Sequence, residues 1–134
     1  KYQAIPFVFL DLGANFGYWT AKVAAGRYGA HRTIAVEPSD ICKAILEKNA
    51  ANKNPVAIYK NAIDEESGRK LNLYGDRHAG LSIDQTWYGA SSQVANQVET
   101  ITIDDLLARE MIDPTATPLV IKLDVEAVEL RALK

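Results

Sequence analysis

Two glycines and an acidic residue near the start of the chain have the spacing of a ligand-binding loop. Residues 11–17 read DLGANFG, directly after an apolar run, with Gly13 and Gly17 four residues apart. Glycines let the backbone turn sharply and approach a ligand closely. A helix that begins after them would present free N–H groups to an anionic group. The alternative interpretation is a plain tight turn between a strand and a helix.

The acidic residues indicate which ligand fits this loop. Asp11 ends the first apolar run and Glu37 ends the second, where a carboxylate can accept both hydroxyls of a ribose. The spacing differs from the G-x-G-x-x-G of dinucleotide loops, and an acid beside the loop repels pyrophosphate but attracts an ammonium group. We therefore expect S-adenosylmethionine. Asp11 would hold its amino group, Asn15 and the helix N-terminus would face its carboxylate, and Glu37 would bind its ribose.

Three more polar residues follow apolar runs and are candidates for the same site. Asn61 carries an amide that could hydrogen-bond adenine or could equally cap a strand end. Asp124 and Glu126 lie two apart in an extended segment, so their side chains point the same way. A carboxylate within about 3 Å of a hydroxyl can accept its proton as a general base. Glu126 is the first candidate for this role and Asp124 the second. Two carboxylates are weak evidence for a cation, and we predict no metal site.

The elements that would position these residues alternate between strand and helix. Strands are predicted over residues 7–10, 33–36, 56–63, 98–103 and 119–123. Helices are predicted over 16–28, after the N-cap candidates Ser39 and Thr102, and from the segment DVEAVE onward. The turn DEESG followed by RKLNLY predicts an inserted β-hairpin. This alternation is typical of an α/β domain with a mainly parallel sheet, and we expect the strand order 3-2-1-4.

Composition narrows the possible classes of protein. The 134 residues, 48% of them hydrophobic, suit one domain with its own core. The net charge of −2 offers no broad electrostatic surface for nucleic acid. No apolar run approaches the ~20 residues that span a bilayer, and no leader opens the chain, so we expect a cytoplasmic protein. Cys42 is the lone cysteine and is expected to pack as a small apolar residue.

Four segments together resemble one family. DLGANFG, IAVEPS, VETITIDDLL and LVIKLDVEAVEL follow in that order over nearly the whole chain. They are similar to the FkbM family of S-adenosylmethionine-dependent methyltransferases, and the last two are more specific than the glycine loop. The resemblance implies a class I methyltransferase fold, which is Rossmann-like. It also implies methyl transfer to a hydroxyl of a small molecule or sugar.

The chain departs from the family pattern in two respects. Ala127 stands where we expect glycine after DVE. The strands that follow the fourth parallel one are absent, so residues 1–134 are expected to form a single domain that is incomplete at its C-terminal end. A truncated or non-catalytic nucleoside-binding module is therefore the alternative function, and a dinucleotide-binding oxidoreductase is a third that the glycine spacing opposes. His78, Trp87 and Tyr88 would either line an acceptor site or pack in a surface loop.

Overall fold

The short apolar runs of the chain form a parallel sheet, sheet A. The computed structural model describes residues 5–26, 28–53, 55–76, 80–87 and 92–134. Sheet A has the order β3-β2-β1-β7 and all of its pairs are parallel, which confirms the predicted fold class and strand order. Its strands are β1 (Phe7–Leu12), β2 (Ala30–Val36), β3 (Val56–Tyr59) and β7 (Leu119–Leu123). In the described part of the chain, no helix is both long enough and apolar enough to cross a membrane.

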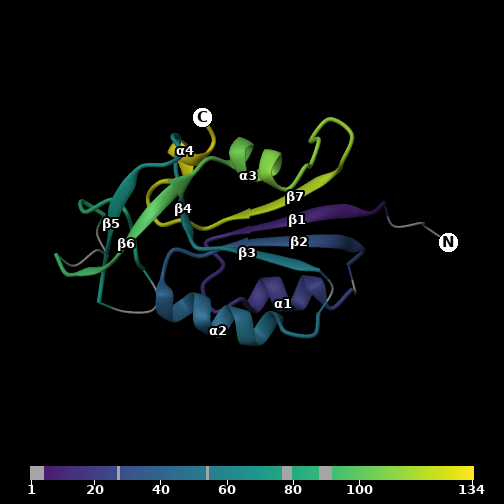
Figure 1. The fold of residues 1–134 in the computed structure, drawn as a ribbon, viewed down its shortest axis with the longest axis horizontal. Helices are drawn as coiled ribbons and strands as arrows, with labels where there is room; N and C mark the ends of the chain where they lie inside the picture. Colours follow the sequence, from purple (N-terminus) through teal and green to yellow (C-terminus); the bar gives the residue numbers. More distant parts are fainter. Residues whose placement is uncertain (1–4, 27, 54, 77–79, 88–91) are drawn as a thin grey trace.

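Helices cover both faces of sheet A, which explains why its strands are apolar on both sides. Successive side chains of β1 alternate between the faces. Leu10 lies in one buried cluster with Leu106 of α3 (Ile103–Arg109), whereas Phe9 packs with Val23 of α1 (Tyr18–Ala24). Figure 1 shows α1 and α2 (Asp40–Ala50) below the sheet, and α3 and α4 (Glu129–Ala132) above it.

Local signals set the helix ends. The Ser39 hydroxyl accepts the Cys42 N–H at 3.3 Å and the Thr102 hydroxyl accepts the Asp105 N–H at 3.1 Å, so both predicted N-caps are confirmed. Cys42 is buried, as expected. The first helix is shorter than the predicted 16–28. It begins only after Gly17, whose φ of 79° lies in the left-handed region and cannot belong to a right-handed helix.

The predicted third strand is in fact two strands that belong to different sheets. The chain leaves sheet A at Lys60, and β4 (Asn61–Ile63) joins a second sheet, sheet B, with β5 (Lys70–Tyr74) and β6 (Val94–Ile101). The order of sheet B is β4-β6-β5, with β6 parallel to β4 and antiparallel to β5. The predicted hairpin across DEESG is therefore wrong, because β6 lies between the two strands that would have formed it.

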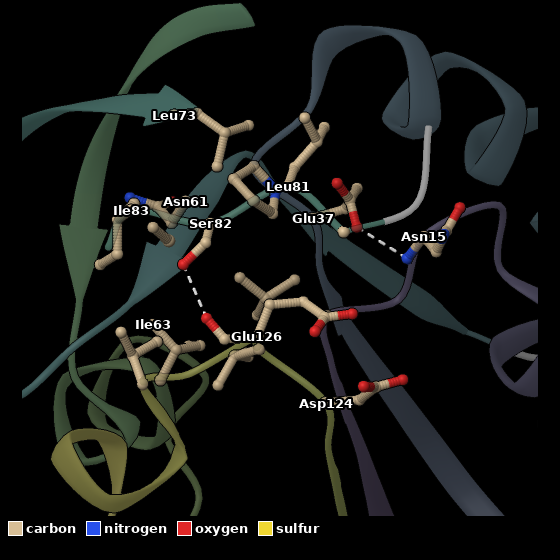
Figure 2. Close-up of a pocket in the computed structure, with 17 residues that line it drawn as sticks. Asn15, Glu37, Asn61, Ile63, Leu73, Leu81, Ser82, Ile83, Asp124 and Glu126 are labelled. Atoms are coloured by element: carbon tan, nitrogen blue, oxygen red, sulfur yellow. Dashed lines mark hydrogen bonds between the residues drawn. The ribbon is translucent and has the colours of Figure 1, made fainter. Parts of the chain in front are cut away.

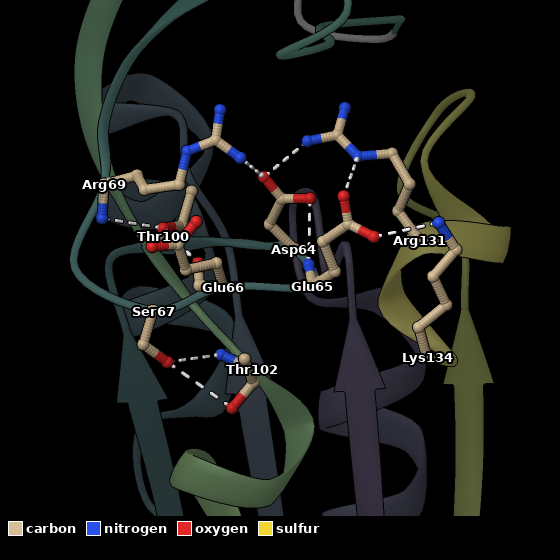
Figure 3. Close-up of polar contacts among 9 residues, drawn as sticks. All are labelled: Asp64, Glu65, Glu66, Ser67, Arg69, Thr100, Thr102, Arg131 and Lys134. Atoms are coloured by element: carbon tan, nitrogen blue, oxygen red, sulfur yellow. Dashed lines mark hydrogen bonds and ion pairs between the residues drawn. The ribbon is translucent and has the colours of Figure 1, made fainter.

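The turn segment 64–69 contacts β6, and this explains how the chain passes from one edge of sheet B to the other. The Gly68 N–H donates to the Thr100 carbonyl at 2.9 Å, and the Thr100 hydroxyl donates to the Glu66 carbonyl at 2.7 Å. Figure 3 shows Thr100 and Glu66 beside an ion pair between Arg131 of α4 and the buried carboxylate of Asp64, at 2.6 Å. This ion pair connects α4 to the turn segment that follows β4.

Sheet B stands beyond the carboxyl ends of the strands of sheet A (Figure 1). The residues that follow β1, β2 and β7 therefore face a second layer of protein rather than open solvent. This arrangement forms the walls of the candidate site.

Candidate active site

A pocket of about 620 Å³, part of it open to solvent, lies where the carboxyl ends of sheet A meet sheet B. Figure 2 shows its walls, which come from the glycine loop, the end of β2, β4, residues 80–83 and the turn after β7. The structure brings together most of the residues that the sequence singled out, and these six line the pocket: Gly13, Asn15, Glu37, Asn61, Asp124 and Glu126. The other two candidates, Asp11 and Gly17, lie behind this lining.

Glu37 is held in place by backbone from two elements. Its side chain is buried, with one carboxylate oxygen accepting the Asn15 N–H at 2.7 Å and the other accepting the Ser39 N–H at 2.9 Å. Burial raises the pKa of Glu37 above its ordinary value, and the two N–H groups act against this shift. A carboxylate oxygen accepts more than one hydrogen bond, so Glu37 can still bind hydroxyl groups of a ligand.

The two glycines of the loop make room for neighbouring protein segments. Gly13 has φ 78°, and a Cβ there would lie 1.9 Å from the carbonyl oxygen of Asp124. Gly17 has φ 79°, and a Cβ there would lie 2.4 Å from Cδ1 of Leu46 on α2. Positions 13 and 17 therefore have no side chain because Asp124, directly after β7, and Leu46 of α2 pack against the backbone there. The close approach also brings Asp124 to the same pocket edge as the loop.

Asp11 contacts the ammonium group of a lysine that the sequence analysis did not single out. The Asp11 side chain is completely buried, accepts the Thr20 hydroxyl at 2.6 Å and lies 3.2 Å from Nζ of Lys122. Lys122 also donates to the Gly13 carbonyl at 2.8 Å and lies 3.5 Å from a carboxylate oxygen of Asp124. Asp11 was predicted to hold the amino group of the ligand, whereas in this structure its carboxylate is engaged by Lys122. Lys122 can be recognised as the partner of Asp11 only from the strand register, which pairs the two residues across β1 and β7.

Asp124 and Glu126 differ in their surroundings although they are two residues apart. The Asp124 side chain is 63% exposed, whereas Glu126 is half-buried and its side chain points into the pocket (Figure 2). Burial raises the pKa of Glu126, and the neighbouring carboxylates of Asp124 and Glu129 raise it further. Of the two acids, Glu126 is therefore the one in the more enclosed position.

Two hydrogen bonds hold residues of sheet B and of its β5–β6 loop at the pocket wall. The Asn61 side-chain amide donates to the Glu99 carbonyl of β6 at 3.0 Å, which orients its side chain at the pocket wall. The Ser82 hydroxyl donates to the Glu126 carbonyl at 2.7 Å. Ser82 was missed because it lies in a loop with no periodic pattern. Of the aromatic candidates in that loop, Trp87 lies near Gly80, and His78 and Tyr88 fall outside the described residues.

Comparison with known proteins identifies the family. A family model described as the methyltransferase FkbM domain matches residues 11–134. The chain belongs to the FkbM methyltransferase family. The predicted resemblance is thereby confirmed, and the FkbM domain begins at the acid of the glycine loop. No curated protein matches the chain.

A solved structure shares the fold of this FkbM domain. It is the crystal structure of methyltransferase FkbM from Methylobacillus flagellatus KT, which is 18% identical, with a TM-score of 0.62. The match covers 100% of this chain and 29% of that chain. The similarity supports the methyltransferase fold, and the present chain spans less than a third of the length of that protein.

The turn after β7 explains why glycine was expected in this FkbM domain at position 127. Glu126 has φ 46° and Ala127 has φ 73°, so both occupy the left-handed region that costs an L-residue about 1–2 kcal/mol. Ala127 is exposed, so its side chain contributes little packing.

We expect Ala127→Gly to raise the free energy of unfolding by about 0.5–1 kcal/mol, because relief of the left-handed strain exceeds the added flexibility of the unfolded chain. Urea unfolding would measure it. Ala51→Gly is the control, since Ala51 is also exposed but has an ordinary φ of −56° and should lose stability on the same change. Equal losses in both variants would contradict the strain.

Proposed function

We propose that this FkbM domain binds S-adenosylmethionine in the pocket and serves methyl transfer to a hydroxyl of a small molecule or sugar. The observation that carries the proposal is the meeting of Glu37, Asn61 and Glu126 at one pocket beyond the carboxyl ends of a parallel sheet. Ligands of open α/β sheets bind in this position. The family assignment supports a methyltransferase, and the donor and the acceptor class are our inference.

The residues present fit the donor. Glu37 can accept ribose hydroxyls, and Asn61 can hydrogen-bond adenine with its side-chain oxygen because its nitrogen is engaged by Glu99. The exposed carboxylate of Asp124 can meet a cationic amino group, with Asp11 acting behind it through Lys122. Asn15, in the glycine loop, is the candidate for the donor's carboxylate.

The donor supplies an electrophilic methyl group, and the protein must then position and deprotonate the acceptor. Glu126 is the residue we assign to accept the hydroxyl proton, because it points into the pocket and its raised pKa brings its proton affinity closer to that of a base working near neutral pH. Asp124 is the second candidate. Holding both reactants in one orientation contributes the larger share of the rate, up to roughly 7–11 kcal/mol in well-oriented reactions.

Titration calorimetry on the full-length protein tests the donor. We expect S-adenosylmethionine to bind and NAD to give no heat, because the loop lacks the glycine spacing of a dinucleotide site. Binding of NAD without binding of S-adenosylmethionine would overturn the proposal. Donor binding without methyl transfer to any hydroxylated small molecule or sugar would favour the non-catalytic module.

We expect Glu37→Gln to weaken binding of S-adenosylmethionine about 10- to 150-fold, the equivalent of the 1.5–3 kcal/mol contributed by a hydrogen bond to a charged group. A glutamine also turns an NH₂ toward one of the two N–H groups that Glu37 now accepts. Glu47→Gln, on the exposed surface of α2, is the control and should bind the donor normally. Unchanged affinity in Glu37→Gln would remove Glu37 from the site.

A further inference from the structure

We propose that Ser82 is a positioning residue for Glu126: its hydroxyl, bonded to the Glu126 carbonyl, sets the direction in which the Glu126 side chain enters the pocket. The inference rests on the proposed function, in which Glu126 is the base. The two residues lie 44 positions apart in the chain, and Oγ of Ser82 lies 2.7 Å from the carbonyl oxygen. The bond therefore joins the loop between β5 and β6 to the turn between β7 and α4 (Figure 2).

Ser82 itself is held by three hydrogen bonds, so its hydroxyl has a defined direction. It exchanges two backbone hydrogen bonds with Tyr74 of β5, at 2.8 and 3.1 Å. Its Oγ accepts the Asp84 N–H at 3.0 Å, which leaves the hydroxyl proton for Glu126. Ser82 is only 1% exposed, so water does not replace this donor readily. The Ser82 hydroxyl is therefore held in place by contacts that do not involve Glu126.

The turn that receives this bond has a backbone that needs external support. Glu126 and Ala127 both have positive φ, at 46° and 73°. Such conformations persist only when surrounding contacts over-determine them. Because the Cβ direction of a residue follows its φ and ψ, relaxation of the turn would rotate the Glu126 side chain. The contact to Ser82 therefore acts on the carboxylate through the backbone of the same residue.

The carboxylate's surroundings would report such a rotation. The charged groups that face it are Asp124 at the end of β7 and Glu129 on α4, and Lys122 lies beside Asp124. Burial and these two acids raise the pKa of Glu126 in the folded protein. A side chain turned toward solvent would lose part of that burial, so its pKa would move back toward the ordinary value.

The test follows the Glu126 carboxyl signal by ¹³C NMR during a pH titration of the full-length protein without donor, with Glu126→Gln identifying the signal. We expect Ser82→Ala to lower the pKa of Glu126 and Ser82→Thr, which keeps the hydroxyl, to restore it. Ser67→Ala is the matched control. This substitution also removes a serine oxygen that accepts a backbone N–H, from Thr102 at 2.9 Å (Figure 3). Ser67 is not among the residues that line the pocket.

The outcomes separate this inference from the proposed function. An unchanged Glu126 titration in Ser82→Ala, with donor binding intact, overturns the role of Ser82 alone. A shift of the same size in Ser67→Ala overturns it as well, because general destabilisation would then explain both. Failure of the wild-type protein to bind S-adenosylmethionine overturns the proposed function, whereas the titration without donor still decides whether Ser82 orients Glu126.

Discussion

Gly13→Ala is expected to destabilise the domain by about 2–5 kcal/mol and to abolish donor binding. Alanine pays about 1–2 kcal/mol for the left-handed backbone at this position. Its Cβ would also lie 1.9 Å from the Asp124 carbonyl oxygen, so the loop or the end of β7 must move. Overpacking against backbone typically costs a further 1–3 kcal/mol or more. The same movement would displace Asp124 and Glu126 from the pocket.

Gly68→Ala is the matched control for this prediction. Gly68 has φ 81°, close to the 78° of Gly13, but an added Cβ there meets no atom within 4 Å. The two variants therefore share the conformational cost, and the difference between them measures the clash with Asp124. Urea unfolding gives the stabilities, and calorimetry with S-adenosylmethionine gives the affinities. Equal stability losses in the two variants would show that β7 does not pack as closely on the loop as described.

Lys122→Met is expected to lower the free energy of unfolding by about 3 kcal/mol, because it leaves the buried carboxylate of Asp11 without its cation. The Asp11 side chain is 0% exposed, so water cannot replace the ammonium group as it could at the surface. The Gly13 carbonyl loses its hydrogen bond from Lys122 at the same time. Chemical denaturation measures the change.

Two further variants separate the ion pair from the loss of a lysine. Lys43 is 25% exposed, close to the 23% of Lys122, and pairs with Glu47 on the surface of α2. Lys43→Met should cost only a few tenths of a kcal/mol, because exposed ion pairs contribute little. Adding Asp11→Asn to Lys122→Met should recover part of the loss, since the buried charge disappears with its partner. A double variant that is simply additive would contradict the pairing.

Local pattern was enough to predict sheet A and that polar residues at its strand ends would lie together. Buried parallel strands appear as short apolar runs, and Ser39 and Thr102 mark helix starts through hydrogen bonds that span three residues. The carboxyl ends of parallel strands meet at one edge of a sheet, so the sequence predicts that Glu37, Asn61 and Glu126 lie close together.

Sheet B could not be predicted in the same way, because its pairing depends on residues far apart in the chain. The run from Val56 to Ile63 reads as one strand, and its break at Lys60 follows from the partners of each half. Val56 pairs with Thr33, whereas Asn61 pairs with Glu99. The predicted hairpin was wrong for the same reason, since a strand from much later in the chain took the position beside β4.

Residue types and local periodicity predict the chemical groups that line the pocket and the strand ends that carry them, because both are visible within a few positions of the chain. What those groups contact depends instead on how distant segments pack together. Lys122 meets Asp11 across two strands, the Asp124 carbonyl occupies the space that Gly13 leaves, and Ser82 reaches Glu126 from the β5–β6 loop. Each of these contacts joins residues that lie more than 40 positions apart in the chain. Whether such residues meet depends on how the sheets and helices pack.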